Sequence, residues 1–306
     1  MNLLNRHTAL YRSILLTSLS LLLTLTAFAQ NGNLTDSACG EEDYDCQIVE
    51  SNKKIDINPN DYIAYYKRGW AFYNKLNYDQ ALKDFNKVIA LQKNSPNAFI
   101  YRGIIYQNRG SYRKAITNFT RAIELDSQNT SSFFRRGYSY MEINEYEAAI
   151  RDFNKVIEIN PDYVLAHNNL GHSYKALGKL SEAAEHYDLA LKLYEKLINQ
   201  TPSDDYLYYG RGGIYMVLNK YSEAVEDYNR AIEILPDYEE YYFKRGLAYS
   251  YQEMFEYALI DFTKAIELNP EVAKLYQYRA EVFTKLGQKG YAEADLQKYK
   301  ELMEKP

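Results

Sequence analysis

Residues 239–272 read EEYYFKRGLAYSYQEMFEYALIDFTKAIELNPEV, and this 34-residue stretch decides the fold because versions of it fill most of the chain. Its glycine and its later alanine recur at a 34-residue step, with one longer step between the fourth and fifth copies. The glycines are Gly69, Gly103, Gly137, Gly171, Gly212 and Gly246, with Ala280 in a seventh copy, and the alanines are Ala81, Ala115, Ala149, Ala183, Ala224, Ala258 and Ala292. Self-similarity at a fixed period of this length indicates a repeat architecture.

Each copy predicts two helices joined by a short turn. In the second copy, Phe99, Tyr106, Phe119 and Ala122 fall at helical spacing and are expected to face the partner helix. The recurring glycine and alanine stand where the two helices of a pair approach each other. Prolines close the second helix, because the residue before a proline avoids the α region. These prolines are Pro161, Pro236 and Pro270. The unit is therefore an αα-hairpin.

The order aromatic, Gly, aromatic, Ala, aromatic, Ala, Pro at a period of 34 residues resembles the tetratricopeptide repeat. The resemblance implies an all-α fold, a right-handed superhelical α-solenoid of tandem helix-turn-helix repeats. In such a solenoid each hairpin buries its apolar face only against its neighbours. The expected copies are residues 62–95, 96–129, 130–163, 164–197, 205–238, 239–272 and 273–306.

The N-terminal segment, residues 1–29, has the pattern of a secretory signal peptide. Arg6, His7 and Arg12 precede an apolar run that begins at Ile14, and Ala27-Phe28-Ala29 supplies a small-residue cleavage site. A retained membrane anchor is the alternative, but the run is short for a span. We therefore expect an exported protein, periplasmic or secreted, with no membrane span in the mature chain.

The rest of the chain divides into four expected segments. Residues 30–43 are a flexible leader, and residues 44–61 form an N-terminal capping helix. Residues 62–200 hold repeats 1 to 4, with the last helix lengthened by a seven-residue excess, and residues 201–306 hold repeats 5 to 7. Seven residues are about two helical turns, so the lengthened helix keeps its phase.

Two cysteines, Cys39 and Cys46, lie in the polar segment before the repeats. In an oxidising compartment a disulfide between them is the natural interpretation. Two free thiols or an intermolecular bond are the alternatives.

An arginine stands before the glycine in most copies, where the family usually has leucine. Its counterpart on the second helix is an aspartate, which predicts an ion pair between the two helices. The pairs are Arg68 with Asp84, Arg136 with Asp152, Arg211 with Asp227, Arg245 with Asp261 and Arg279 with Asp295. The second copy has Arg102 and Asn118, and the fourth has lost both residues, with Leu170 and His186. The alternative is a row of ligand-binding arginines.

The chain offers little for catalysis. Three histidines, His167, His172 and His186, fall in the fourth copy, but the repeat geometry points them in different directions. The sequence has no Ser-His-Asp arrangement, Gly-rich phosphate loop or HExxH motif. We expect no enzyme activity, no cofactor and no metal site. The formal charge of −5 and the lack of a Lys and Arg run argue against a nucleic-acid partner.

The resemblance implies a concave groove lined by the second, fifth, ninth and twelfth residues of each first helix. Here these positions supply an aromatic and apolar ligand surface: Tyr66, Trp70, Tyr73, Ile100, Ile104, Phe134, Tyr138, Met141, Tyr206, Tyr209 and Phe243. The family's carboxylate clamp for acidic chaperone tails has Lys and Asn where this chain has Tyr66 and Trp70, so that function is not carried over. For Ile100, Ile104 and Phe134, simple packing between first helices is an equal alternative.

A non-enzymatic protein–protein interaction scaffold is the function that these features favour, with a peptide or protein segment bound in the groove. The alternative is a carbohydrate-binding or envelope assembly factor that uses the same aromatics. The partner and the oligomeric state stay open.

Overall fold

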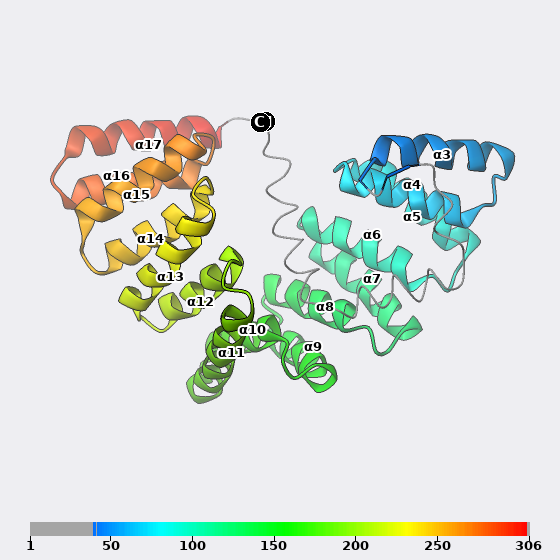
Figure 1. Ribbon diagram of the computed structural model, residues 1–306, viewed down its shortest axis with the longest axis horizontal. Helices are drawn as coiled ribbons and strands as arrows, with labels where there is room; N and C mark the ends of the chain where they lie inside the picture. Colours follow the sequence, from blue (N-terminus) through cyan, green and yellow to red (C-terminus); the bar gives the residue numbers. More distant parts are fainter. Residues whose placement is uncertain (1–38, 41, 305–306) are drawn as a thin grey trace. The chain divides into compact units, whose positions relative to one another are not determined.

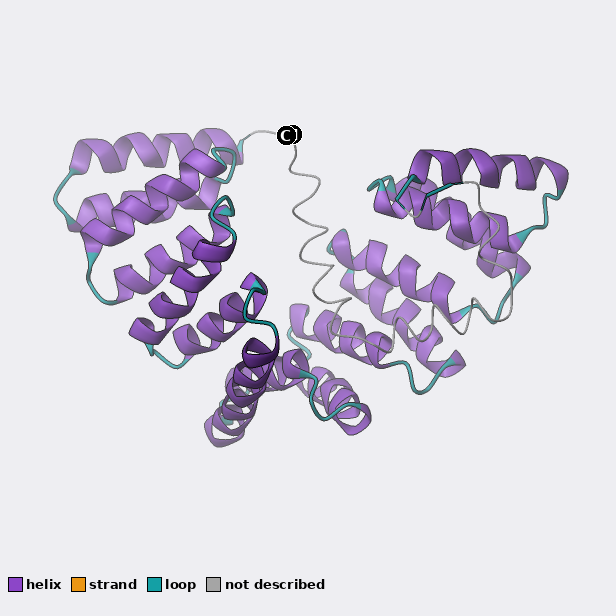
Figure 2. Cartoon of the chain, viewed as in Figure 1, coloured by secondary structure: helices purple, strands orange, loops and turns teal. Residues whose placement is uncertain are grey.

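The computed structural model describes residues 39–40 and 42–304, and every regular element in this part of the chain is an α-helix (Figure 2). The expected signal peptide, residues 1–29, and most of the expected leader lie outside the described residues. None of the described helices is both long and apolar enough to cross a membrane.

The described residues fall into two compact units that divide between Lys179 and Leu180 (Figure 1). The helices of the first unit are α3 (Tyr44–Ile57), α4 (Tyr62–Asn74), α5 (Tyr78–Leu91), α6 (Pro96–Asn108), α7 (Tyr112–Leu125), α8 (Thr130–Glu142), α9 (Tyr146–Ile159) and α10 (Val164–Ala176). The helices of the second unit are α11 (Leu180–Gln200), α12 (Asp205–Val217), α13 (Tyr221–Ile234), α14 (Glu239–Tyr251), α15 (Phe255–Leu268), α16 (Ala273–Lys285) and α17 (Lys289–Met303).

Within each unit the helices pair as the sequence predicts. First and second helices pack as hairpins in α4–α5, α6–α7 and α8–α9, and in α12–α13, α14–α15 and α16–α17. Each hairpin also packs on the next, so the core runs between copies. Phe153 and Val156 of α9, for example, are fully buried with Ala166 and Leu170 of α10. Both units are therefore stacks of tandem helix-turn-helix repeats.

Short polar side chains start several helices. The carboxylate of Asp61 accepts a hydrogen bond from the backbone nitrogen of Ala64 at 3.0 Å, and Asn129 does the same for Ser132 at 2.9 Å. Such N-caps satisfy a backbone N–H group that has no partner within its helix.

The turn inside each hairpin contains one residue in the left-handed conformation. It is a glycine in three of these turns, for example Gly110 with φ of +67°, but Glu253 with φ of +58° in the turn between α14 and α15. The left-handed region is unfavourable for a residue with a Cβ atom, whereas glycine enters it readily. The turn at Glu253 is therefore strained.

We expect Glu253→Gly to raise the free energy of unfolding by about 1 kcal/mol, because glycine relieves this strain. The measurement is urea unfolding followed by circular dichroism. The matched control is Glu281→Gly, at an exposed site inside α16, which should lose about 1 kcal/mol through lower helix propensity. Equal losses in the two variants would contradict the account of the turn.

Candidate functional site

The predicted groove residues lie on the first helices of the hairpins, on α4, α6 and α8 in the first unit and on α12 and α14 in the second. On α4, Tyr66, Trp70 and Tyr73 follow each other at steps of four and three residues, so they share one face of the helix. We call the predicted groove residues of each unit its first-helix row.

Four members of these rows are core residues. Ile100, Ile104 and Phe134 are 9%, 5% and 8% exposed, and Phe243 is 4% exposed. Each belongs to a buried cluster between neighbouring hairpins. These four side chains offer almost no surface to a ligand, and their observed role is packing.

The other seven members are half-buried and keep part of their surface accessible. They are Tyr66, Trp70, Tyr73, Tyr138, Met141, Tyr206 and Tyr209. Six of the seven are aromatic. The accessible part of each row is therefore made mainly of rings.

In the first unit, the rings of the row support one another. The ring of Trp70 meets that of Tyr44 edge-on at a centroid distance of 5.6 Å, and Tyr73 meets Tyr101 edge-on at 5.5 Å. Tyr101 in turn stacks on the buried Phe85 at 5.5 Å. Burial raises the pKa of Tyr66 and of Tyr101, so both hydroxyls stay neutral at physiological pH.

Sequence reasoning missed Tyr44 and Tyr101. Tyr44 is the first residue of α3, outside the repeats, and Tyr101 follows directly after the groove position Ile100. The register of the repeat carries no signal for either residue, because it assigns neither to the groove.

In the second unit, a tyrosine cluster holds the row. Tyr209 lies 5.9 Å from Tyr206 and 5.4 Å from Tyr241 between ring centroids. The hydroxyl of Tyr241 donates a hydrogen bond to the carboxylate of Asp205. Burial raises the pKa of both Tyr209 and Tyr241. These rings are held in place before any ligand binds. The tyrosine side chains would therefore lose little conformational entropy on binding.

The structure joins each predicted arginine and aspartate by two parallel hydrogen bonds. Arg245 donates from Nε and Nη2 to the two carboxylate oxygens of Asp261, at 2.8 and 2.7 Å. The same paired bonds join Arg68 to Asp84, Arg136 to Asp152, Arg211 to Asp227 and Arg279 to Asp295. The bond to the aspartate raises the pKa of Arg68 and of Arg211.

Arg68, Arg136, Arg245 and Arg279, and also Arg102 of the second copy, donate a further hydrogen bond to the helix that precedes their hairpin, which sequence reasoning missed. The Nη1 atom of Arg245 donates to Asn229 at 2.6 Å, on the second helix of the copy before. The equivalent acceptors are Asn52 for Arg68, Asn86 for Arg102, Thr120 for Arg136 and Thr263 for Arg279. Asn52 lies before the repeats. Each of the other acceptors lies two residues after the aspartate or asparagine that pairs with the arginine of its own copy, and this pattern is visible in the sequence.

Each arginine that makes this further bond thus ties three helices together. Its donors face protein oxygen atoms, and its side chain is only about a fifth exposed, 19% for Arg245. The paired aspartates are 2% to 6% exposed. The observed role of these residues is structural.

The histidines do not converge. The ring of His167 is buried and its Nε2 atom lies 3.0 Å from the backbone oxygen of Pro161, within hydrogen-bond distance. Burial, together with the nearby Lys175, lowers the pKa of His172. Among the described residues, no group of three or more His, Cys, Asp and Glu side chains is arranged to hold a metal ion.

Cys39 and Cys46 form a disulfide, with their Cα atoms 5.6 Å apart. The bond lies at the start of α3, where the carboxylate of Asp43 accepts a hydrogen bond from the backbone nitrogen of Cys46 at 3.0 Å. It therefore anchors the beginning of the helix whose Tyr44 contacts Trp70.

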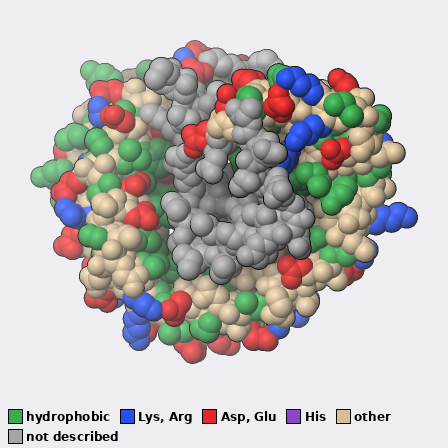
Figure 3. Space-filling model, turned by 45° about the vertical axis from the view of Figure 1, so that its right-hand side comes forward, with side chains coloured by type: hydrophobic (Ala, Val, Ile, Leu, Met, Phe, Trp, Pro, Cys, Tyr) green, Lys and Arg blue, Asp and Glu red, His purple; other side chains and the backbone are tan. Residues whose placement is uncertain are grey.

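Hydrophobic, acidic and basic side chains are mixed over the described surface that Figure 3 shows.

Models of the repeat match most of the hairpins. Two models described as tetratricopeptide repeat match residues 164–197 and 239–272, and residues 62–95 and 96–129. A third, described as TPR repeat, matches residues 137–178 and 212–253. Together these matches cover more than half of the chain. No curated protein matches the sequence.

Solved structures share the fold at low sequence identity. A tetratricopeptide repeat protein from Parabacteroides merdae matches with a TM-score of 0.61 and 20% identity, over 80% of this chain and 100% of that chain. Cut9, in a complex with Hcn1 of the APC/C, matches with a TM-score of 0.64 and 17% identity, over 79% of this chain and 46% of that chain. The human IFIT1 dimer with PPP-AAAA matches with a TM-score of 0.57 and 17% identity, over 82% of this chain and 63% of that chain. At these identities the likeness shows the fold alone.

Proposed function

Since the chain belongs to the tetratricopeptide repeat family, whose repeats are typical scaffolds of protein–protein interaction, we propose that it binds a peptide or protein segment along its first-helix rows. The protein acts as a non-enzymatic scaffold. Its partner is an extended or helical segment, which binds through apolar contacts with the first-helix rows rather than through a carboxylate clamp.

The half-buried rings of the first unit are the observation that carries the proposal. Trp70, Tyr73 and Tyr138 keep accessible surface while neighbouring rings hold Trp70 and Tyr73 in place. Tryptophan and tyrosine dominate binding hot spots because they bury a large area for few rotatable bonds. A partner that inserts apolar side chains between such rings gains most of its affinity there.

The scaffold works outside the cytoplasm in this proposal. The signal-peptide pattern of residues 1–29 supports export, and so does the disulfide between Cys39 and Cys46, since such bonds persist in oxidising compartments.

The test is a pull-down from envelope extract of the source organism with the wild type and a double variant, Trp70→Ala with Tyr138→Ala. We expect the double variant to lose at least about tenfold in affinity for the partner that the wild type recovers, because each ring supplies about 1–2 kcal/mol. Bound partners are identified by mass spectrometry, and affinity is then measured by calorimetry.

The matched control is Tyr291→Ala, which removes a 66% exposed ring outside the rows and should leave binding unchanged. Recovery of the same partners at the same affinity by wild type and double variant would contradict the proposal. A glycan array adds a separate arm, in which specific sugar binding that is lost in the double variant would favour a carbohydrate ligand instead.

A further inference from the structure

Four exposed apolar residues run from the end of α14 through the following turn onto α15, and the first-helix rows do not explain them. Tyr251, Met254, Tyr257 and Ile260 follow each other at steps of three residues and are 61%, 37%, 54% and 65% exposed. We call these four residues the α15 patch. Tyr251 also stacks on Tyr221 at 5.2 Å, and Tyr257 lies 5.3 Å from the ring of Tyr249, so neighbouring rings extend the patch.

The repeat itself does not require these residues to be apolar. Other copies have mainly polar or charged residues at the same places. The place of Ile260 holds Lys83, Thr117, Arg151, Glu185, Glu226 and Ala294. The place of Tyr257 holds Gln80, Lys114, Ala148, Glu182 and Glu223, and only the seventh copy repeats the tyrosine, as Tyr291. The place of Met254 holds Asn77, Ser111, Glu145, Lys179, Lys220 and Gln288. An exposed apolar surface that only the sixth copy presents in full indicates a contact with another molecule.

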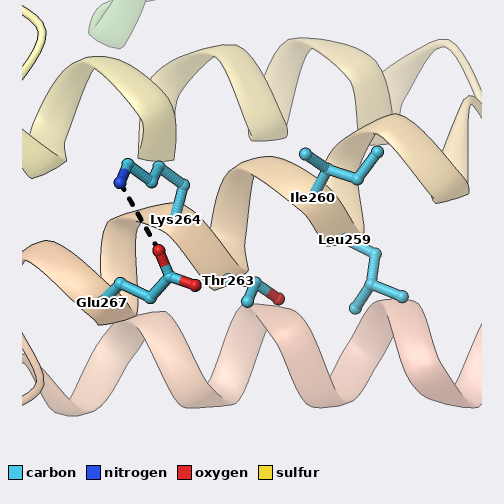
Figure 4. A pocket seen from close by; sticks show the side chains of 5 residues that line it. All are labelled: Leu259, Ile260, Thr263, Lys264 and Glu267. Atoms are coloured by element: carbon cyan, nitrogen blue, oxygen red, sulfur yellow. Dashed lines mark hydrogen bonds and ion pairs between the residues drawn. The ribbon is translucent and has the colours of Figure 1, made fainter.

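A shallow pocket continues the patch along α15 (Figure 4). It has a volume of about 370 Å³ and is lined by Leu259, Ile260, Thr263, Lys264 and Glu267. Lys264 and Glu267 form an ion pair at 3.5 Å beside it. The pocket is large enough for one apolar side chain of a partner, next to a charged pair that can reorient.

The surroundings of the patch are acidic. Residues 180–306 contain 15 Lys and Arg against 23 Asp and Glu, a formal charge of −8, whereas the whole chain carries −5. Glu253 and Glu256, both exposed, flank the patch directly. A complementary partner therefore carries positive charge around an apolar stripe.

We propose that the α15 patch binds an amphipathic helix of another protein, with apolar residues three and four apart and Lys or Arg on its flanks. The line from Met254 through Tyr257 and Ile260 to Thr263 of the pocket is about 14 Å long, which matches two to three turns of such a helix. A second copy of this chain fits less well, because its own patch would bring two acidic surfaces together. An anionic membrane is disfavoured for the same reason.

The test measures binding of a synthetic amphipathic peptide of about 18 residues, with Leu on one face and Lys on the other. Fluorescence anisotropy follows the labelled peptide during titration with the full chain. We expect the Leu/Lys peptide to bind at least about tenfold more tightly than a scrambled peptide of the same composition or a peptide with Glu in place of Lys.

The diagnostic variant is Tyr257→Glu with Ile260→Glu, which introduces the residues that the fifth copy has at these places. It should weaken binding by at least about tenfold although it adds negative charge. The control, Gln80→Glu with Thr117→Glu, makes the same charge change at equivalent places in the first unit and should leave binding unchanged.

Several results would overturn the proposal. No binding of the Leu/Lys peptide, or unchanged or tighter binding by the Tyr257→Glu, Ile260→Glu variant, would exclude an apolar contact at α15. Loss of binding in the Trp70→Ala, Tyr138→Ala variant would place the peptide on the first-helix row instead. A dimer in sedimentation, or binding to phosphatidylcholine vesicles, that disappears in the patch variant would assign the patch to a second copy or to a membrane.

Discussion

Arg245→Ala is expected to lower the free energy of unfolding by about 3–5 kcal/mol. The change removes two hydrogen bonds from the carboxylate of Asp261, which is 2% exposed, and leaves its charge buried without a partner. It also removes the bond to Asn229 in the preceding copy, so the contact between two hairpins weakens. Urea unfolding, fitted with a nearest-neighbour model because repeats need not unfold in one step, measures the loss.

A double-mutant cycle tests whether this loss belongs to the pair. Asp261→Ala together with Arg245→Ala should destabilise by at least about 1 kcal/mol less than the sum of the two single changes. Simple additivity would contradict the pairing.

The second copy supplies a matched control in the same chain. Arg102 donates from Nε to Asn118 at 2.6 Å, and the side-chain amide of Asn118 also donates to the backbone oxygen of Lys114 at 2.7 Å. Arg102→Ala therefore leaves a neutral group that keeps a bond. We expect a loss of about 1–2 kcal/mol, smaller than that of Arg245→Ala. A loss of equal size would show that the buried charge is unimportant.

Gly246→Ala is expected to lower the free energy of unfolding by about 1–3 kcal/mol, although alanine is the better helix former. A Cβ atom at Gly246 would lie 2.8 Å from Cε1 and 3.0 Å from Cδ1 of Phe262. The ring of Phe262 is fully buried and has no room to withdraw. The measurement is again unfolding in urea.

The seventh copy shows how the chain accepts alanine at this place. Ala280 stands where the glycine is expected, and Leu296 stands where the other copies have the ring. The penalty of Gly246→Ala should therefore disappear in a Phe262→Leu background. Gly213→Ala is the control, because a Cβ atom there meets nothing within 4 Å, and it should be neutral or slightly stabilising. If Gly246→Ala proves as harmless as Gly213→Ala, the close approach of the helices is not what selects glycine.

The hairpin fold could be predicted from the sequence because the repeat constrains both the individual helices and the packing between them. The same 34-residue step places the glycine, the facing ring and the closing proline, so local helix signals and the packing between helices agree. The arginine and aspartate pairs were visible for the same reason, since comparison of copies acts as an internal alignment.

The accessible surface could not be predicted in the same way. Position in the repeat tells which face of a first helix a residue occupies, but exposure depends on the side chains around it. Ile100 and Trp70 occupy groove positions of neighbouring copies, yet one is 9% exposed and the other half-buried beside Tyr44. The α15 patch likewise consists of residues that differ from those of the other copies. The sequence shows the difference, but only the structure shows that these side chains are exposed.

The left-handed turn residue at Glu253 is a similar case. In three other copies a glycine at this place indicates the conformation, but here the chain keeps the turn with an unfavourable residue because the surrounding hairpin imposes it.

Site-specific photocrosslinking tests the proposed ligand surface most directly. A p-benzoylphenylalanine residue is placed at Tyr73 in the first-helix row of the first unit or, as a control, at Tyr291, and the protein is irradiated in its native compartment. The account predicts crosslinks from Tyr73 to one short segment of a partner protein, with none from Tyr291 to that segment. Equal crosslinking from the two positions, or none from Tyr73, would contradict the claim that the first-helix row binds the partner.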